Sequence, residues 1–309
     1  MDINKLKSVL TREEEITFAL RALYSDYGYK RYRMSKFEEY DLYAGKKDYL
    51  VSDRVITFND TDGRLLALKP DVTLSILKSC RGEVKGVQRL QYGENVYRVW
   101  DGSHSFRELM QAGLECIGEV CEKEICEVLL LAYESLKEIS KDFSLVISSL
   151  ELVDAILEQI GDVGAIKELT ASIERKNLYE LKRICSKHGI EGKTAKNVLA
   201  LCEIYGVPKE VIKKLRMLEL PEKAKAALDA LEHYVLLLES SGAKERVCID
   251  FSLGANRKYY NGIVFGGFVD GIPSSILKGG RYDKLAQSMG IDKGAVGFAV
   301  YLDELERLG

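Results

Sequence analysis

The sequence predicts an α+β protein in which strand-rich segments enclose a helical one. Residues 88–99 and 106–118 have the composition of two strands, and the polar turn Asp101-Gly102-Ser103 between them indicates a hairpin. From residue 149 to residue 241 the pattern changes to helical periods separated by glycines and prolines, and strand character resumes afterwards. We therefore expect a core of residues 1–148 and 242–309 and an inserted helical subdomain of residues 149–241.

Composition excludes several classes of protein. A chain of 309 residues, 46% hydrophobic and 30% charged, is typical of a soluble globular protein. The net charge of −3 gives no general attraction to nucleic acid, no apolar run approaches about 18 residues, and the start lacks a signal peptide's apolar core. Seven scattered cysteines without a C-x-x-C pair, and only three histidines, argue against a metal site and for a reducing compartment. We expect a cytoplasmic protein with no metal, cofactor or membrane contact.

The first third of the chain carries clear start and stop signals. Thr11 and Glu14 form a capping box that opens a helix, and Gly28 is a plausible stop for that helix. Pro70 suits the first turn of another helix. Further elements are expected at residues 29–34 (strand), 54–58 and 65–68 (hairpin), 74–80 (helix), 121–141 (amphipathic helix) and 143–148 (strand).

The second strand of the long hairpin has an unusual polar face. Its alternation puts on one side Arg107, Leu109, Gln111, Gly113, Glu115 and Ile117. We interpret Gly113 as leaving room for a ligand, with Gln111 and Glu115 as flanking contacts. The alternative is a sheet edge with solvated polar residues and a glycine bulge. Likewise, Asp71 and Thr73 either only cap the helix that follows them or face the same cavity from its rim.

The last part of the chain is rich in glycine. Residues 247–253, 262–269 and 276–277 read as strands, residues 279–283 open an amphipathic helix that carries Leu285 and Met289, and residues 294–308 pass from a small-residue segment into a terminal helix. The pair Gly279-Gly280 lacks the P-loop and dinucleotide fingerprints, and no hydrolase motif occurs.

Five segments in order resemble the histidyl-tRNA synthetase family. LKPDVT resembles that family's LRPEGT, and FRELMQAGLECIG resembles the second class II motif. Three more segments match it: YYNGIVF, GGRYDKL and AVGFAVYLDEL, which begin at residues 259, 279 and 295. The resemblance covers residues 10–148 and 245–308, and it implies an antiparallel class II sheet flanked by helices, normally dimeric, with a helical insertion.

The resemblance also implies a histidine pocket. Asp71, Thr73 and Gln111 stand where the family holds the α-amino group of histidine, since their oxygen atoms can accept hydrogen bonds from an ammonium group. Glu115, Tyr260 and Tyr282 stand where it surrounds the imidazole ring. Core or interface packing is the other interpretation of the tyrosines, including Tyr259.

Several positions depart from the synthetase pattern. Ala255 replaces the catalytic arginine and Glu304 replaces the third-motif arginine that grips ATP, whereas Arg98 keeps the second-motif arginine. Because arginines stabilise the charge that develops at the phosphate, amino-acid activation should be lost. Ser35 stands where the first motif has proline, which weakens the expected dimer contact. Arg257 is a candidate partner for the ligand carboxylate.

A histidine-shaped pocket without synthetase machinery resembles the ATP phosphoribosyltransferase regulatory subunit family. That resemblance implies a non-catalytic subunit, with a short-form catalytic subunit as partner and histidine as the feedback inhibitor of histidine biosynthesis. It also implies a homodimer within a hetero-oligomer, and we expect no tRNA partner, because no anticodon-binding domain follows residue 305. Two alternatives stay open: an active histidyl-tRNA synthetase core or related ATP-dependent enzyme, and a structural adaptor without ligand binding.

Overall fold

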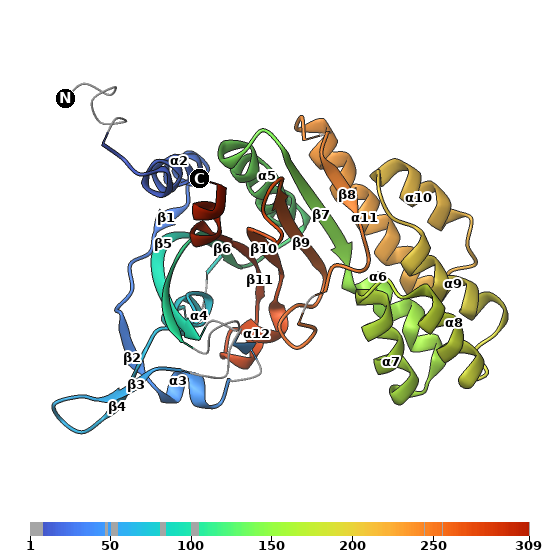
Figure 1. Cartoon of the computed structure of the whole chain (residues 1–309), viewed down its shortest axis with the longest axis horizontal. Coiled ribbons are helices and arrows are strands. Elements are labelled where there is room, and N and C mark those ends of the chain that lie inside the picture. Colours follow the sequence, from blue (N-terminus) through green and yellow to red (C-terminus); the bar gives the residue numbers. More distant parts are fainter. Residues whose placement is uncertain are drawn as a thin grey trace.

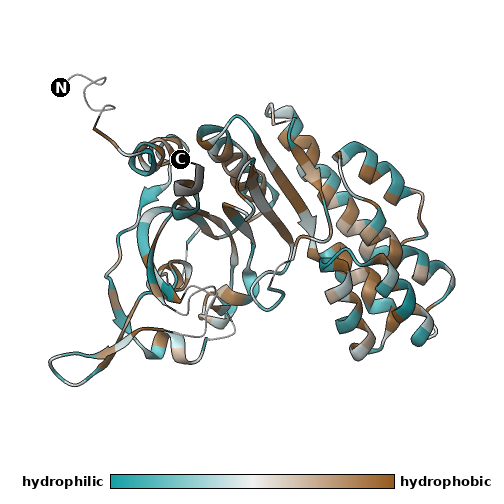
Figure 2. Cartoon of the chain, viewed as in Figure 1, coloured by the Kyte–Doolittle hydropathy of each residue, from teal (hydrophilic) through white to brown (hydrophobic). Residues whose placement is uncertain are grey.

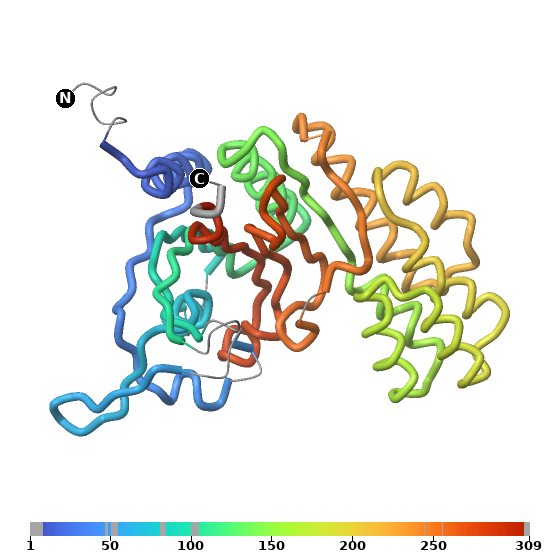
Figure 3. The backbone as a smooth tube through the Cα atoms, viewed as in Figure 1, coloured from blue at the N-terminus to red at the C-terminus, as the bar shows by residue number. Residues whose placement is uncertain are grey.

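The computed structural model describes residues 9–46, 49–50, 55–80, 85–99, 105–243, 245–254 and 256–308. Figure 1 shows a large curved sheet with helices on its faces, and a group of helices at one end of it. The backbone trace in Figure 3 shows that the C-terminal strands lie between the β5–β6 hairpin and β7, so that both ends of the chain build one sheet.

Within the described residues, eight strands form the large sheet in the order β1-β5-β6-β11-β10-β9-β7-β8. Neighbouring strands are antiparallel except for the outer pairs β1–β5 and β7–β8. The strands are β1 (Lys30–Arg31), β5 (Val87–Val99), β6 (Phe106–Gly118), β7 (Phe143–Ser149), β8 (Val247–Ile249), β9 (Ile263–Val269), β10 (Leu277–Arg281) and β11 (Gly294–Tyr301). A small antiparallel sheet contains β2 (Phe37–Glu39), β4 (Leu65–Leu68) and β3 (Thr57–Asn59), in that order.

The predicted long hairpin is confirmed. Strands β5 and β6 pair over their whole length, from Val87 opposite Gly118 to Val99 opposite Phe106. Its turn, Asp101-Gly102-Ser103, lies outside the described residues. The alternation of β6 also holds, because Ala112, Leu114 and Cys116 enter the hydrophobic core while the intervening side chains face the other way.

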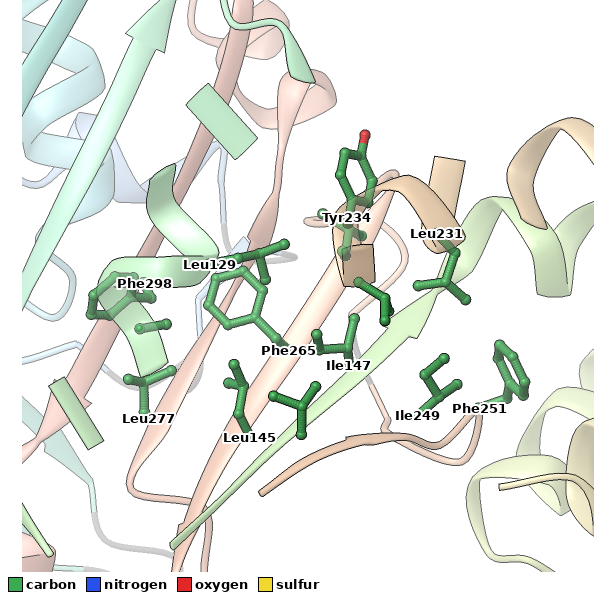
Figure 4. Packing of buried hydrophobic residues seen from close by; sticks show 14 of the residues in the cluster. Leu129, Leu145, Ile147, Leu231, Tyr234, Ile249, Phe251, Phe265, Leu277 and Phe298 are labelled. Atoms are coloured by element: carbon green, nitrogen blue, oxygen red, sulfur yellow. The ribbon is translucent and has the colours of Figure 1, made fainter. Parts of the chain in front are cut away.

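One face of the sheet packs on the helices α2 (Arg12–Asp26) and α5 (Glu122–Ile139). Helix α2 begins at the predicted capping box, in which the Thr11 side chain accepts from the Glu14 backbone and the Glu14 side chain accepts from the Thr11 backbone. Figure 4 shows how Leu129 of α5 meets Phe265 and Phe298 of the sheet.

The opposite face has a separate hydrophobic cluster. It is covered by the short helices α3 (Asp41–Ala44), α4 (Thr73–Ser79) and α12 (Asp283–Ser288). The cluster leaves part of this face uncovered, and the candidate site lies there.

Between β7 and β8 the described residues contain helices and no strand. They are α6 (Leu150–Leu157), the 3-10 turn η2 (Glu158–Ile160), α7 (Val163–Glu174), α8 (Leu178–Lys187), α9 (Gly192–Glu203), α10 (Pro208–Arg216) and α11 (Glu222–Ser240). Their hydrophobic sides face one another and their hydrophilic sides face outward (Figure 2). The predicted α+β class with an all-helical insertion is therefore correct.

The insertion shares its core with the sheet. Leu231 and Tyr234 of α11 lie in the same hydrophobic cluster as Leu145 and Ile147 of β7 (Figure 4). The division of the chain into residues 1–148 with 242–309 and residues 149–241 stays a prediction.

Five local predictions need correction. The strands expected at residues 29–34 and 247–253 contain only two and three residues, respectively. Pro70 precedes α4 by three residues instead of lying in its first turn. The helix expected to open over residues 279–283 is α12, which begins only at Asp283, because Gly279 and Gly280 lie in β10. The small-residue segment before the terminal η3 (Leu302–Leu308) is strand β11. Both glycine-rich segments, β10 and β11, form strands because neighbouring strands hydrogen-bond to their backbones, an effect that local sequence propensity does not predict.

No helix in the described ranges has both the length and the apolar character needed to cross a bilayer.

Candidate functional site

A cavity of about 580 Å³ opens on the face of the sheet that carries α4 and α12. Strands β6, β11, β10 and β9 form its floor, α4 and the segment before β9 form its walls, and residues after β11 close one end. The volume lies within the range of small-molecule sites, roughly 300–1,000 Å³.

The register of the sheet arranges the floor in rows. Glu115 lies opposite Gly297, which lies opposite Gly280. The next row contains Gly113, Ala299 and Lys278, and in a third row Gln111 lies opposite Tyr301. The glycines in the first two rows let larger side chains lie directly on the sheet: Glu115 over Gly297, the Tyr260 ring over Gly280 and Tyr92 over Gly113.

Glu115 is the most constrained side chain of the site. It is only 2% exposed, and its Oε1 accepts a hydrogen bond of 2.6 Å from the Thr73 hydroxyl. Its Oε2 accepts a short hydrogen bond from the Tyr282 hydroxyl. A Cβ atom at position 297 would lie 1.9 Å from Glu115 Oε2, so Gly297 is required for this carboxyl group to cross β11.

Burial raises the pKa of Glu115 to about 8, against the lowering effect of the hydrogen bonds from Thr73 and Tyr282. The nearby Asp71 carboxylate raises this pKa further. An empty site therefore holds a mostly protonated Glu115 at neutral pH. Such a group can donate a proton to a ring nitrogen, or pair as a carboxylate with a cation that arrives with the ligand.

Asp71 and Thr73 lie at the start of α4, and both line the cavity. Asp71 Oδ1 accepts from the Leu74 backbone N–H at 2.8 Å, so it caps the helix as well. Its Oδ2 lies 3.7 Å from a guanidinium nitrogen of Arg98. Burial raises the pKa of Asp71, and Arg98 opposes that rise. For Asp71 the sequence left open whether it caps the helix or faces the cavity, and the structure shows that it does both.

Gln111 is 2% exposed and lines the cavity. Its Nε2 has no hydrogen-bond partner among the described residues. Buried amide groups are normally satisfied, so this donor is available to a ligand. The amide oxygen on the same group is an acceptor.

Aromatic rings form the wall above Glu115. The ring centroids of Tyr259 and Tyr260 are 4.5 Å apart, and those of Tyr259 and Tyr282 are 5.6 Å apart. Burial raises the pKa of all three phenols well above 10, so they stay neutral donors. A Cβ at Gly280 would lie 2.8 Å from the Tyr260 ring, so this glycine makes room for the wall.

Two tyrosines were missed by the sequence analysis. A Cβ atom at Gly113 would lie 2.6 Å from the Tyr92 hydroxyl oxygen and 2.3 Å from the Phe298 carbonyl oxygen. The space above Gly113 is thus filled by Tyr92 rather than left for a ligand, which corrects the prediction. The pairing of Tyr92 with Gly113 across the hairpin could have revealed this contact. Tyr301, opposite Gln111, also lines the cavity.

The arginine candidates have different outcomes. Arg98 lines the cavity, but its Nε donates to the Pro70 carbonyl oxygen at 2.6 Å and it pairs with Asp71. Arg257 pairs with Asp154 of α6 and does not line the cavity, so the structure does not support it as the carboxylate partner.

The two positions that depart from the synthetase motifs stand as follows. Ala255 lies outside the described residues. Glu304 lines the cavity, and its Oε2 accepts from the Ser274 hydroxyl at 2.8 Å. A carboxylate there repels phosphate groups. The described side chains contain no group of three His, Cys, Asp or Glu that could hold a metal ion.

A sheet of this topology with an amino-acid-sized polar pocket beside a helical insertion defines a protein of the class II histidyl-tRNA synthetase type. A family model described as histidyl-tRNA synthetase matches residues 5–305. A structure of an ATP phosphoribosyltransferase regulatory subunit/histidyl-tRNA synthetase from Bacillus halodurans superposes with a TM-score of 0.85 and 26% identity, covering 96% of this chain and 79% of that one.

The curated relatives show which family of synthetase-like proteins the chain belongs to. The ATP phosphoribosyltransferase regulatory subunit of Caldanaerobacter subterraneus is 33% identical over 92% of this chain and 75% of its own length. The fold is also shared, at 19% identity and a TM-score of 0.74, with a chain of the ATP phosphoribosyl transferase (HisG:HisZ) complex from Thermotoga maritima, covering 94% of this chain and 97% of that one. The chain belongs to the family of ATP phosphoribosyltransferase regulatory subunits, which places it as a regulatory and not a catalytic subunit.

Proposed function

We propose that this chain is required for the activity of a short-form ATP phosphoribosyltransferase catalytic subunit, and that it inhibits that subunit when its own cavity binds histidine. The observation that carries the proposal is the arrangement of Glu115, held by Thr73 and Tyr282 inside a cavity with space for an amino acid. A buried carboxyl group with a raised pKa costs folding free energy, so a ligand-binding role explains its presence better than packing does.

The ligand's two ends find different partners. The imidazole ring fits beside Glu115 and the rings of Tyr260 and Tyr282, where one proton can be shared between the carboxyl group and a ring nitrogen. The ammonium group fits near Asp71, whose carboxylate it can meet together with the hydroxyl of Thr73 and the amide oxygen of Gln111.

Regulation follows from differential binding. The assembly with the catalytic subunit needs an active and an inhibited arrangement, and histidine must bind the inhibited one more tightly. Support for such a partner comes from the family name and from the occurrence of this fold in a complex of that enzyme. We further propose that the chain forms a homodimer within a cytoplasmic hetero-oligomer and has no tRNA partner.

The test is an assay of a short-form catalytic subunit with and without this chain. We expect the two to co-purify, the transferase rate to rise on mixing, and L-histidine to reverse the rise. Glu115→Gln should preserve the stimulation and weaken the inhibition. Glu119→Gln is the matched control, because its exposed carboxylate pairs with Lys293 far from the cavity lining. Absence of stimulation by the intact chain contradicts the proposal.

A second candidate function is an active histidyl-tRNA synthetase core, and it is favoured by the retained Arg98. Against it, Arg98 is engaged by Asp71 and Pro70, and Glu304 places negative charge where the third motif carries its arginine. Histidine-dependent exchange between ATP and pyrophosphate by the purified chain would establish this candidate. The adaptor alternative predicts no calorimetric signal with millimolar histidine.

A further inference from the structure

The cavity is poor in available cations. Among the described residues that line it, the cationic side chains are Arg98 and Lys278. Arg98 is only 6% exposed, donates to the Pro70 carbonyl oxygen and pairs with Asp71. Its charge is therefore already used inside the protein. A free amino acid brings a carboxylate, and burying a carboxylate without a partner is costly.

Lys278 rises from the middle of the floor. It lies in β10 between Ala299 of β11 and Gly266 of β9, which are too small to cover its side chain. Its Nζ sits 5.7 Å from the centre of the Tyr301 ring, a distance at which the ring face attracts a cation. Within the described part of the chain, no ion pair or hydrogen bond ties this ammonium group to a carboxylate.

The register of the sheet arranges Glu115, Gln111 and Lys278 as the three corners of a triangle on the floor of the cavity. Glu115 and Gln111 both project from β6, four residues apart. Lys278 lies two strands away, in the row between theirs. Adjacent strands are about 4.8 Å apart, and an extended lysine side chain reaches about 6 Å, so its ammonium group can return toward the space above β11. Tyr301, on which Nζ rests, is the direct partner of Gln111.

We propose that Lys278 binds the α-carboxylate of the amino-acid ligand, together with the unpartnered Nε2 of Gln111, and so takes the place of the arginine that the synthetase motif has at the position of Ala255. The three corners then match the three polar parts of histidine: Glu115 for the ring, Asp71 with the Gln111 oxygen for the ammonium group, and Lys278 with the Gln111 nitrogen for the carboxylate. This inference rests on the proposed function, since it takes a free amino acid as the ligand.

The cavity-lining residues that follow β11 agree with this assignment. Beyond Tyr301 the chain carries Asp303 and Glu304, and both line the cavity. Their carboxylates disfavour an anion beside them, which favours the space between Lys278 and Gln111 for the ligand's negative group. Lys278 therefore selects free amino acids over amines of the same shape.

The test compares two probes by calorimetry on the full chain: L-histidine, and histamine, which has the ring and the amine but no carboxylate. We expect the intact chain to prefer L-histidine. Lys278→Met should weaken L-histidine binding by about 10- to 100-fold, the equivalent of one lost charged hydrogen bond, and leave histamine binding unchanged. Lys278→Arg should restore much of the loss. Lys293→Met, which removes a surface lysine paired with Glu119, is the matched control and should bind both probes like the intact chain.

The outcomes separate the two proposals. If the intact chain binds neither probe, the proposed histidine-sensing function fails, and this inference fails with it. If the intact chain binds L-histidine but Lys278→Met binds it equally well, histidine sensing stands and the role of Lys278 is wrong. An equal loss of both probes in Lys278→Met would show a general disturbance of the cavity and would also overturn the assignment, since only the carboxylate-bearing probe should be affected.

Discussion

Replacing Glu115 with glutamine changes one atom of the site and removes its titratable group. The hydroxyls of Thr73 and Tyr282 both donate to this carboxyl group, and the side chain is almost fully enclosed. Glutamine keeps the volume, and its oxygen can still accept one of those hydrogen bonds. The substitution therefore tests the shared proton rather than the shape of the cavity.

The expected loss of L-histidine affinity is about 1–3 kcal/mol, or roughly 5- to 150-fold. A hydrogen bond that involves a charged group contributes about 1.5–3 kcal/mol. In the intact chain the net contribution of this hydrogen bond to binding is smaller than that, because Glu115 has a pKa of about 8. It must release its proton, at a cost in free energy, to act as a carboxylate at neutral pH.

The pH dependence makes the test sharper. In the complex, Glu115 and the imidazole ring together hold one proton. Between the ring's ordinary pKa of about 6.5 and the pKa of about 8 of Glu115, the separate partners also hold one proton between them, so affinity should be highest in that window. Above about pH 8 the separate partners hold no proton, so forming the complex requires the uptake of one. Below about pH 6.5 they hold two protons, so forming the complex requires the release of one. The affinity for L-histidine should therefore fall on both sides of the window.

Calorimetry with L-histidine from pH 5.5 to pH 9 measures this pH profile of affinity. The same titration of Glu115→Gln is the comparison. In Glu115→Gln the decline above about pH 8 should become shallower, because the titration of Glu115 is removed and only the ligand's ammonium group still loses its proton there. An intact chain whose affinity is flat across this range, or a variant with unchanged affinity at neutral pH, would refute the assignment of Glu115 to the ring.

Three further outcomes are expected. Because the folded state raises the pKa of Glu115 from 4.5 to about 8, the contribution of Glu115 to the stability of the empty chain should be greatest below about pH 4.5 and fall by up to about 5 kcal/mol as the pH rises to about 8. The difference in stability between the intact chain and Glu115→Gln in urea titrations should change with pH in this sense. Gly297→Ala should cost about 1–3 kcal/mol of stability and abolish histidine binding, since its Cβ overlaps Glu115, whereas Gly45→Ala, with nothing within 4 Å, should do neither. Arg257→Met should leave calorimetric histidine affinity unchanged, because Arg257 pairs with Asp154; a tenfold loss would return it to the site.

Much of the architecture could be predicted from local signals. The β5–β6 hairpin, α5 and β7 have strong periodicity over long stretches, and their bounds differ from the predicted ones by one or two residues. The signal was weakest where glycine is frequent. Gly279 and Gly280 belong to the segment expected to open a helix, yet β9 and β11 pair with these two residues on both sides and hold them in a strand.

The candidate site could also be predicted in part from the sequence. Motif order brought Asp71, Thr73, Gln111, Glu115, Tyr260 and Tyr282 into one group, and the structure gathers all of them around one cavity. The sequence analysis named Arg257 as the candidate cation and did not single out Lys278. The proposal of Lys278 depends on which strand rows meet across β11 and on the contact of Arg257 with α6, which only the structure shows.

The sequence by itself therefore determined the class of fold, the family and most side chains of the pocket, since these depend on periodicity and on the order of short motifs. Only the tertiary structure decided what each group does there. Burial raises the pKa of Glu115, Tyr92 rather than a ligand occupies the space over Gly113, and Arg98 is engaged by Asp71. Each of these results comes from neighbours distant in the chain, which no local pattern encodes.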